Sequence, residues 1–152
     1  MAKSKFQKYE TETIKRENIK NAPYNPRIMD KDAADRLRKE IRQNGLVAAP
    51  VWNRRTGNIV GGHQRIKQLD TLEKSQDYEL TVCVIDVDEK QEAILNVELN
   101  NASIQGEWDL GKLAEMSDQF DIDFMNDLSF TEDDVDFMFS GDDRYSKLFK
   151  PS

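Results

Sequence analysis

The residues best suited to chemistry lie in the run Ile59–Leu69, which reads IVGGHQRIKQL. Gly61 and Gly62 separate an apolar pair of residues from a helical pattern. Small residues let the backbone approach a ligand closely, and the N–H groups at a helix start point at an anion. His63 and Arg65 would lie in the first helical turn, where an imidazole and a guanidinium reach phosphate oxygens. The spacing predicts a phosphate site, although a tight turn followed by a surface histidine has the same spacing.

Hydrophobic spacing predicts the elements that position this run. Ile66, Leu69 and Leu72 recur at intervals of three and indicate an amphipathic helix over 64–74, directly after the glycines. Elsewhere the pattern predicts strands at 12–19, 46–52 and 79–87, helices at 31–44 and 88–100, and two acidic amphipathic helices at 110–120 and 131–139.

Side chains that begin or end helices support these boundaries. Asp30 is placed as the N-cap of the helix over 31–44, and Gly45 stands where a helix end favours a left-handed residue. Thr131 followed by Asp134 is a variant of the capping box.

Composition limits the classes of protein that this chain can represent. Its 152 residues suit one domain of ordinary size, and with 38% apolar and 34% charged residues we expect a modest core. We find no membrane-spanning run and no secretory signal, so we expect a cytoplasmic protein without a membrane partner. The single cysteine, Cys83, rules out an internal disulfide and a cysteine-clustered zinc site, and its apolar surroundings predict a buried strand thiol.

Charge is distributed unevenly along the chain. Residues 1–70 contain 16 Lys and Arg against 8 Asp and Glu, whereas residues 71–152 contain 6 against 21. A basic face for nucleic acid and an acidic part for a basic partner would explain this asymmetry, unless the charges mix again in space. The candidate DNA-backbone contacts are Arg36, Arg38, Lys39, Arg42, Arg54 and Arg55, with a solvated helix face as the alternative.

Five phenylalanines give the acidic region unusual apolar content, and we expect it to dock on the domain or on a basic partner. Trp52 and Trp108 could stack on a base, but tryptophans on strands and at helix junctions usually belong to the core.

Four stretches, taken together, resemble the N-terminal domain of ParB and its sulfiredoxin relatives over about residues 13–139. NAPYNPR at 21–27 is similar to the family's Asn-Pro-Arg box, and LRKEIRQNGLVAAPVW at 37–52 is similar to the helix and strand that follow it. IVGGHQR stands where partition proteins carry Gly-Glu-Arg-Arg and where sulfiredoxins carry a Gly-Gly-Cys-His-Arg loop. VCVIDVDEKQEAILNVELNNASIQGEWD at 82–109 is similar to the Asn-rich segment of ParB-like modules in phages and mobile elements.

The resemblance implies a compact α/β (α+β) domain with a small mixed sheet and packed helices, followed by acidic C-terminal helices. It also implies a bound nucleoside triphosphate, CTP or ATP, with Mg²⁺. Carried over by position, the phosphate contacts would be Gly61, Gly62, His63, Gln64, Arg65 and Arg27. Glu98, Asn100 and Asn101 could coordinate the metal, since carboxylate and amide oxygens suit a hard cation.

The chain also departs from the family in ways that affect function. The glycine loop has no nucleophilic cysteine, so the sulfiredoxin reductase reaction is not expected. Gln64 replaces the first arginine of the partition-type box, which puts clamp-style CTP switching in doubt. Residues 109–139 carry neither a basic recognition helix nor heptads, so sequence-specific DNA reading is not supported. The oligomeric state, including a homodimer, stays open.

These observations predict a flexible leader at 1–12, a ParB/sulfiredoxin-like nucleotide-binding domain at 13–108, an acidic helical extension at 109–139 packed on or next to it, and a tail at 140–152. The leading hypothesis is a nucleoside-triphosphate-binding protein acting with DNA in a phage, plasmid or partition-type process, in a bacterial or phage-infected cell. Slow hydrolysis would use His63 and Glu98 as the candidate catalytic residues. An accessory module for a DNA methyltransferase or packaging complex is the alternative. A ParB-like nuclease is the third possibility, but the sequence shows no paired-carboxylate cluster for two-metal cleavage.

Overall fold

The computed structural model describes residues 2–23, 25 and 28–140. The chain divides into two compact units, Met1–Ile104 and Gln105–Ser152, and each is described here by itself. Most of the expected tail, 140–152, lies outside the described residues. Within the described part, no helix combines the length and apolar character needed to span a bilayer.

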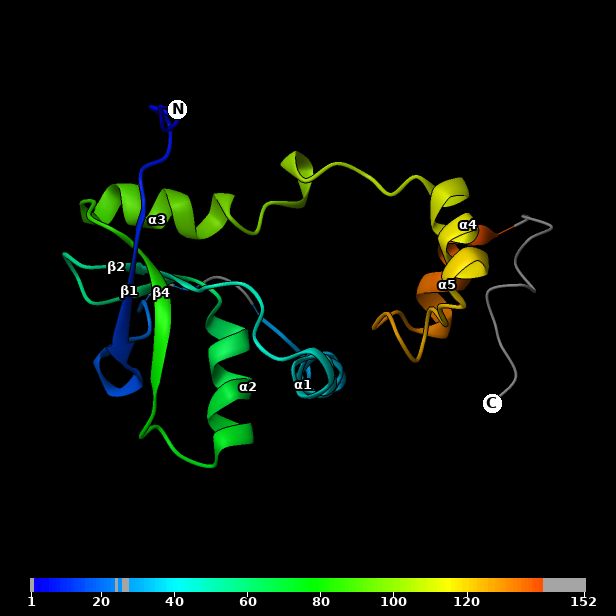
Figure 1. Ribbon diagram of the computed structural model, residues 1–152, viewed down its shortest axis with the longest axis horizontal. Coiled ribbons are helices and arrows are strands. Elements are labelled where there is room, and N and C mark those ends of the chain that lie inside the picture. Colours follow the sequence, from blue (N-terminus) through cyan, green and yellow to red (C-terminus); the bar gives the residue numbers. More distant parts are fainter. Residues whose placement is uncertain (1, 24, 26–27, 141–152) are drawn as a thin grey trace. The chain divides into compact units, whose positions relative to one another are not determined.

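The first unit is built on a four-stranded mixed sheet with the order β1-β4-β2-β3. The strands are β1 (Glu10–Lys15), β2 (Val51–Asn53), β3 (Ile59–Gly61) and β4 (Glu79–Ile85). β4 pairs antiparallel with β1 and parallel with β2, and β2 pairs antiparallel with β3 (Figure 1). The prediction of a small mixed sheet in an α+β domain is confirmed.

The core of this unit lies between β4 and helix α2 (His63–Glu73). Side chains alternate along a strand, so Leu80, Val82 and Val84 share one face of β4 and are all buried. Ile66 of α2 packs against this face, and Ile19 and Ile59 complete the cluster. This packing anchors the first turn of α2 directly behind β3.

Two further helices complete the first unit. α1 (Lys31–Asn44) begins at the predicted N-cap, where Asp30 Oδ1 accepts a hydrogen bond of 2.7 Å from Ala33 N, and it ends at the predicted Gly45. α1 packs on α2, which lies between α1 and the sheet in Figure 1. α3 (Glu89–Glu98), capped by Asp88, packs on β3 and is followed by a short 3-10 helix, η2 (Ala102–Ile104).

A buried carboxylate that the sequence analysis did not single out joins α3 to the β2–β3 hairpin. Glu92 is fully buried and accepts hydrogen bonds from Asn53 Nδ2 at 2.8 Å, from Asn58 Nδ2 at 3.2 Å and from the Thr56 hydroxyl. Burial raises the pKa of the Glu92 carboxyl above its ordinary value. These hydrogen bonds hold the hairpin that ends in the glycine pair against α3.

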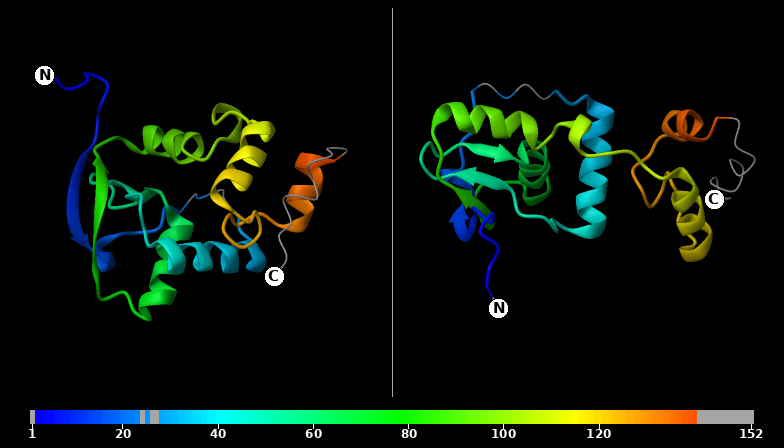
Figure 2. Two further views of the ribbon diagram at one scale, coloured as in Figure 1. Left: turned by 45° about the vertical axis from the view of Figure 1, so that its right-hand side comes forward. Right: turned by 90° about the horizontal axis from the view of Figure 1, so that it is seen from above.

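The N-terminal strand differs from the prediction. β1 begins at Glu10, inside the range expected to be a flexible leader, because Glu10 pairs with Val84 of β4. It ends at Lys15 rather than continuing to residue 19, and a 3-10 helix, η1 (Arg16–Asn18), follows. The turn at η1 carries the Arg16 side chain into the interior, which alternation along a strand could not predict. The left view of Figure 2 shows β1 and β4 side by side.

Two single-residue predictions for this unit need correction or refinement. Cys83 lies on β4 as expected, but on the opposite face to Val82 and Val84, and it is only partly buried. Trp52 is half-buried next to the core, and its indole Nε1 donates a hydrogen bond of 2.9 Å to the carbonyl oxygen of Gly57.

The second unit is a small helical pair with a core of its own. It contains α4 (Leu110–Phe120) and α5 (Glu132–Phe139), capped by Asp109 and by the predicted capping box of Thr131 and Asp134. The buried cluster consists of Leu113, Ala114, Phe124, Val135 and Phe139. The expectation that Trp108 belongs to the core is wrong, because its side chain is 65% exposed and contacts Phe130 only edge to face.

Candidate functional site

The glycine pair forms the turn that joins β3 to α2. Gly62 is the N-cap of α2 and has the left-handed backbone angles φ 96° and ψ 17°, a region that favours glycine. A Cβ atom on Gly62 would also lie 3.2 Å from Pro50 Cβ, closer than side chains normally approach. No side chain caps α2, and its first turn contains no acidic residue. The N–H groups at the start of this helix therefore face a position suited to an anion.

Two cavities flank this turn and share three lining residues, Asn25, His63 and Gln64. The larger cavity, about 370 Å³, is lined in addition by Arg16, Asn21, Ile66, Lys67, Asp70 and Gln76. The smaller cavity, about 230 Å³, is lined in addition by Met29, Leu37, Gly62, Arg65 and Asn100. The fold thus brings four of the predicted phosphate contacts, Gly62, His63, Gln64 and Arg65, to one cavity.

His63 lies between the two cavities and has an unsatisfied polar atom. Its Nε2 is buried and has no hydrogen-bond partner within the described residues. Burial lowers the pKa of the imidazole below its ordinary value, so the ring is neutral near pH 7. A buried nitrogen without a partner is costly, and a ligand oxygen or hydroxyl in the cavity would satisfy it.

Arg65 lines the smaller cavity but is not free. Its Nη1 lies 3.0 Å from Glu40 Oε2 of α1, and the side chains are 39% and 25% exposed respectively. The guanidinium is therefore placed by a neighbouring helix at the edge of the predicted phosphate site.

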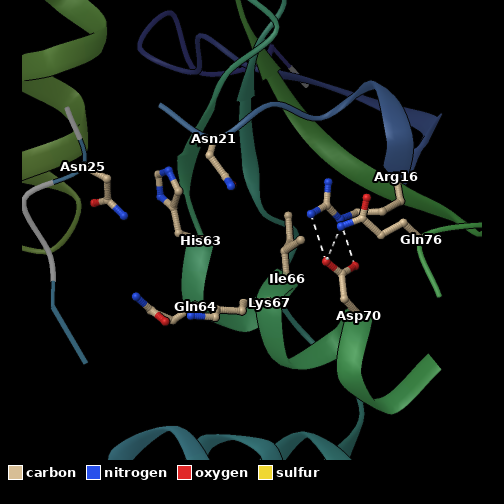
Figure 3. A pocket seen from close by; sticks show the side chains of 9 residues that line it. All are labelled: Arg16, Asn21, Asn25, His63, Gln64, Ile66, Lys67, Asp70 and Gln76. Atoms are coloured by element: carbon tan, nitrogen blue, oxygen red, sulfur yellow. Dashed lines mark hydrogen bonds and ion pairs between the residues drawn. The ribbon is translucent and has the colours of Figure 1, made fainter. Parts of the chain in front are cut away.

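The larger cavity has a charged network at one end that the sequence analysis did not find. Arg16 Nε and Nη2 each donate a 2.9 Å hydrogen bond to the carboxylate of Asp70 on α2, and Nη1 donates to the carbonyl oxygen of Ile19. Tyr78 and Gln76 also donate to Asp70. Figure 3 shows this pair across the cavity from His63 and Asn21. No local signal could have revealed it, since Arg16 and Asp70 lie far apart in the sequence.

The network changes the acidity of its members. Burial alone would raise the pKa of the Asp70 carboxyl, but hydrogen bonds from Arg16, Tyr78 and Gln76 and the charge of Arg16 outweigh it and hold that pKa below its usual value. Burial and the neighbouring Asp70 carboxylate raise the pKa of the Tyr78 hydroxyl. Asp70 is therefore an anion and Tyr78 a neutral donor throughout the physiological range.

Three residues were predicted as metal ligands, and the structure brings one of them to the site. Asn100 lines the smaller cavity, and its Nδ2 donates a 3.1 Å hydrogen bond to the carbonyl oxygen of Asn96. Glu98 is exposed at the end of α3 and accepts a hydrogen bond of 3.4 Å from Asn101 Nδ2. Within the described ranges, no three His, Cys, Asp or Glu side chains are grouped so as to hold a metal ion.

Two predicted phosphate contacts remain: Gly61 is the last residue of β3 and lines neither cavity, and Arg27 lies outside the described residues. Its neighbours along the chain reach the site, since Asn25 lines both cavities and Met29 lines the smaller one.

The residues predicted to contact DNA divide into two groups. Arg54 pairs with Glu12, Arg55 with Asp86, and Arg38 with Asp35, each at 2.7–2.8 Å. Arg38 also donates a 3.0 Å hydrogen bond to Gln68 Oε1 of α2. Arg36, Lys39 and Arg42 follow one another at intervals of three along α1 and form no ion pair with any described residue. Fewer of the predicted basic side chains are therefore available to contact a DNA phosphate backbone than the sequence suggested.

Comparison with known proteins identifies the fold through structure alone. No protein-family model matches the sequence, and no curated protein sequence matches it. The chain is similar to the C-terminally truncated chromosome-partitioning protein ParB from Caulobacter crescentus in complex with CTP-gamma-S, with a TM-score of 0.63 and 14% identity, over 85% of this chain and 76% of that one. It is also similar to a Pnob8-like ParB-N domain, with a TM-score of 0.50 and 18% identity, over 74% of this chain and 46% of that one. The chain therefore has a ParB-like N-terminal domain fold.

Proposed function

We propose that this protein binds a nucleoside triphosphate, CTP or ATP, with the phosphates at the start of α2. One observation carries the proposal: the N-terminus of α2 has no side-chain cap, and next to Gly62 lies His63, which lines both cavities and whose buried Nε2 has no partner among the described residues. A structural neighbour of the same fold was solved with a CTP analogue, which supports a nucleotide as the ligand.

In this proposal, different residues around the turn bind different parts of the nucleotide. Backbone N–H groups of the first turn of α2 and the guanidinium of Arg65 bind phosphate oxygens in the smaller cavity. His63 and the Gln64 amide supply further hydrogen bonds between the cavities. The base lies in the larger cavity, where the carboxamides of Asn21 and Asn25 can both donate and accept.

The donor set at the end of α3 has the chemistry that Mg²⁺ prefers, one carboxylate and two carboxamides. Of these, Asn100 lines the smaller cavity, and Glu98 and Asn101 are close neighbours of Asn100 in the chain. A bound Mg²⁺ would neutralise phosphate charge there. Slow hydrolysis remains a prediction from the sequence, with His63 and Glu98 as the candidate catalytic residues.

The direct test is a calorimetric titration of the full chain with CTP, ATP, GTP and ADP, with and without Mg²⁺. Arg65→Ala should weaken binding about tenfold or more, since a charge-assisted contact contributes roughly 1.5–3 kcal/mol. Lys90→Ala removes the same charge from an exposed position on α3 and should leave the affinity unchanged. Absence of binding by the unaltered protein, or equal affinities of the two variants, would contradict the proposal.

The proposed action on DNA, in a phage, plasmid or partition-type process in the cytoplasm of a bacterial or infected cell, rests on α1. Arg36, Lys39 and Arg42 supply the contacts to the phosphate backbone. Replacing all three by Ala should weaken DNA binding uniformly across sequences and flatten its salt dependence, measured by fluorescence anisotropy at several salt concentrations. An unchanged salt dependence would assign any DNA binding to another surface. The same preparations, incubated with plasmid and Mg²⁺, would show whether the protein nicks DNA.

A second candidate function, an accessory module of a DNA methyltransferase or packaging complex, is favoured by the second unit. Residues 105–140 contain eleven Asp and Glu against one Lys. Phe120 and Phe137 are nevertheless exposed, which suits a basic partner with an apolar centre. Copurification with such a partner should be lost when Phe120 and Phe137 are replaced by Ser. Copurification that survives these substitutions would place the contact elsewhere.

A further inference from the structure

One proposed phosphate contact is held by a negative charge from another helix. Arg65 belongs to the first turn of α2 and lines the smaller cavity, whereas Glu40 lies near the end of α1. The 3.0 Å contact between Arg65 Nη1 and Glu40 Oε2 therefore joins the two helices at the edge of the cavity.

The two arginines that line these cavities are held very differently. Arg16 uses all three guanidinium nitrogens, two of them on Asp70, and its side chain is almost fully buried. Arg65 is engaged through Nη1, and both partners of its ion pair are partly exposed. A buried, bidentate pair is costly to break, whereas a partly exposed single contact contributes little to stability. Arg65 is therefore the arginine that can change partners.

We propose that Glu40 is a built-in counter-ion that holds Arg65 while the cavity is empty and yields it to an anionic ligand. This inference rests on the proposed function. A phosphate group accepts the two parallel hydrogen bonds of a guanidinium fork, so it offers more than the single carboxylate contact. Because a phosphate chain next to Glu40 would also repel its carboxylate, the exchange turns the Glu40 side chain away from the cavity.

The exchange has a consequence for specificity. Glu40 opposes every anion that enters the smaller cavity, and a ligand must carry enough charge to displace it. A triphosphate provides several oxygens for the N–H groups of α2 and for Arg65, whereas a monophosphate provides one group. Glu40 thus acts as a positioning residue that sets a threshold of ligand charge.

The exchange also has a consequence for α1. The polar contacts from α1 to α2 include Glu40 to Arg65 and Arg38 to Gln68. If the Glu40–Arg65 contact is released, the Arg38–Gln68 hydrogen bond and apolar packing are left to hold the C-terminal half of α1 on α2. The same helix carries Arg36, Lys39 and Arg42, so occupancy of the cavity would be transmitted to the basic side of α1.

The matched variants for a test are Glu40→Gln and Asp35→Asn. Each removes one negative charge from α1, but Asp35 pairs with Arg38 and does not contact Arg65. Titrations of the full chain with CTP, CMP and inorganic tripolyphosphate would measure the effect. Glu40→Gln should bind CTP and tripolyphosphate about tenfold more tightly than the unaltered protein, with a smaller gain for CMP. Asp35→Asn should change these affinities by about a factor of two at most, because Asp35 pairs with Arg38 and salt screens a partly exposed charge.

A double-mutant cycle isolates the pair. In an Arg65→Gln background, Glu40→Gln should give a clearly smaller gain, since only the direct repulsion between the Glu40 carboxylate and the ligand is then left to remove. An affinity of Glu40→Gln equal to or below that of the unaltered protein would overturn the inference, as would a gain of the same size in the absence of Arg65. Such results would leave the nucleotide-binding proposal standing wherever the unaltered protein binds CTP. Failure of every variant and of the unaltered protein to bind any of the three probes would overturn both proposals.

Discussion

At the scale of single residues, Gly62 and His63 have the least ordinary surroundings in the site. Gly62 has a left-handed backbone conformation directly against Pro50, and His63 buries a nitrogen that no described residue satisfies. The buried nitrogen without a partner costs free energy in the folded protein, and the glycine occupies a position that another residue could fill only with strain. Both are typical of positions that serve a ligand. Gly62 and His63 are consecutive in the chain. One bound group could therefore form a hydrogen bond with His63 Nε2 while it lies against the backbone of Gly62, where no side chain is in the way.

Replacement of Gly62 by alanine should destabilise the fold and the site together. A left-handed alanine costs about 1–2 kcal/mol, and the contact of 3.2 Å with Pro50 adds to this. Gly57→Ala is a matched control, because Gly57 has φ 80° but its Cβ would meet only Lys20 at an ordinary 3.5 Å. Urea unfolding should show a larger loss of stability for Gly62→Ala than for Gly57→Ala, and only Gly62→Ala should weaken CTP binding. Equal losses in both variants would show that Pro50 moves away freely.

The titration of His63 should be visible without interference, because it is the only histidine in the chain. Its folded pKa lies below the unfolded value of 6.5, so the unfolded state binds more protons between the two values. The contribution of His63 to the free energy of unfolding is therefore complete above the unfolded pKa and is lost as pH falls toward the folded pKa. Bound phosphate should reverse the shift by favouring the imidazolium.

Proton NMR of the imidazole in the free protein and with CTP would measure both pKa values, and His63→Gln should remove the pH dependence of stability in this range. A free-protein pKa at or above 6.5 would contradict the burial argument. A pKa that CTP leaves unchanged would place His63 outside the phosphate contacts.

At the scale of elements, α2 is the part to which the others attach. Arg16 of η1 reaches α2 through Asp70, Glu40 and Arg38 of α1 reach it through Arg65 and Gln68, and the hairpin leads into it at Gly62. The proposed phosphate contacts and the contacts that attach α2 to η1 and α1 therefore lie within the same two turns of α2. Changes at these contacts are expected to affect ligand binding even where they do not touch the cavity.

Asp70→Asn tests the strongest of these attachments. It leaves the guanidinium of Arg16 buried without a counter-charge, and loss of one partner of such a pair costs roughly 3–5 kcal/mol. Asp86→Asn removes the exposed partner of Arg55 and should cost about 1 kcal/mol or less. Arg16→Met combined with Asp70→Asn should recover much of the loss, measured by urea unfolding.

Asp70→Asn should also change the pH dependence of stability. The folded pKa of Asp70 is depressed, so its contribution is present above the unfolded value of 3.8 and is lost as pH falls through the folded pKa. Asp70→Asn should therefore unfold with a weaker acid dependence than the unaltered protein. Similar losses of stability for Asp70→Asn and Asp86→Asn would mean that water reaches Arg16.

The elements themselves were predictable from local patterns. The helix over 31–44 begins and ends where Asp30 and Gly45 placed it, because an N-cap side chain and a glycine at a C-terminus act over a few residues. The helix over 110–120 has the bounds that apolar spacing predicted. The strand expected at 12–19 instead spans Glu10–Lys15. It ends four residues early because a distant carboxylate, Asp70, decides where Arg16 turns inward.

At the scale of the whole molecule, the chain combines two units that differ in charge and in core. The first has its core between a sheet and α2, and the second is a short acidic helical pair around Phe124. A unit as small as the second buries little apolar surface, so its stability is expected to be low and sensitive to its central aromatic residues.

Phe124→Ala should unfold the second unit and leave the first intact. Phe124 is fully buried and lies 5.7–5.8 Å from the ring centroids of Phe130 and Phe139, and its truncation costs roughly 3–5 kcal/mol. Phe137→Ala, at an 88% exposed position, should have no such effect. Amide NMR signals of α4 and α5 should collapse in the first variant, while those of β4 keep their positions. Loss of signals from both units would show that they fold as one.

The sequence by itself determined the type and order of the elements, the glycine turn before α2 and the separation of charge along the chain. These depend on the period of apolar residues, on caps and on glycine, all of which act between neighbours in the chain.

Only the tertiary structure decided which charges are available. It paired Arg16 with Asp70, Arg65 with Glu40 and Arg54 with Glu12, and it buried Glu92 beneath the hairpin. It also brought Asn25 and Asn100 from two distant segments to the turn at Gly62 and His63. Electrostatic and hydrogen-bond partners are set by distance in space rather than by spacing in the sequence. The amino-acid sequence alone therefore could not reveal these pairs.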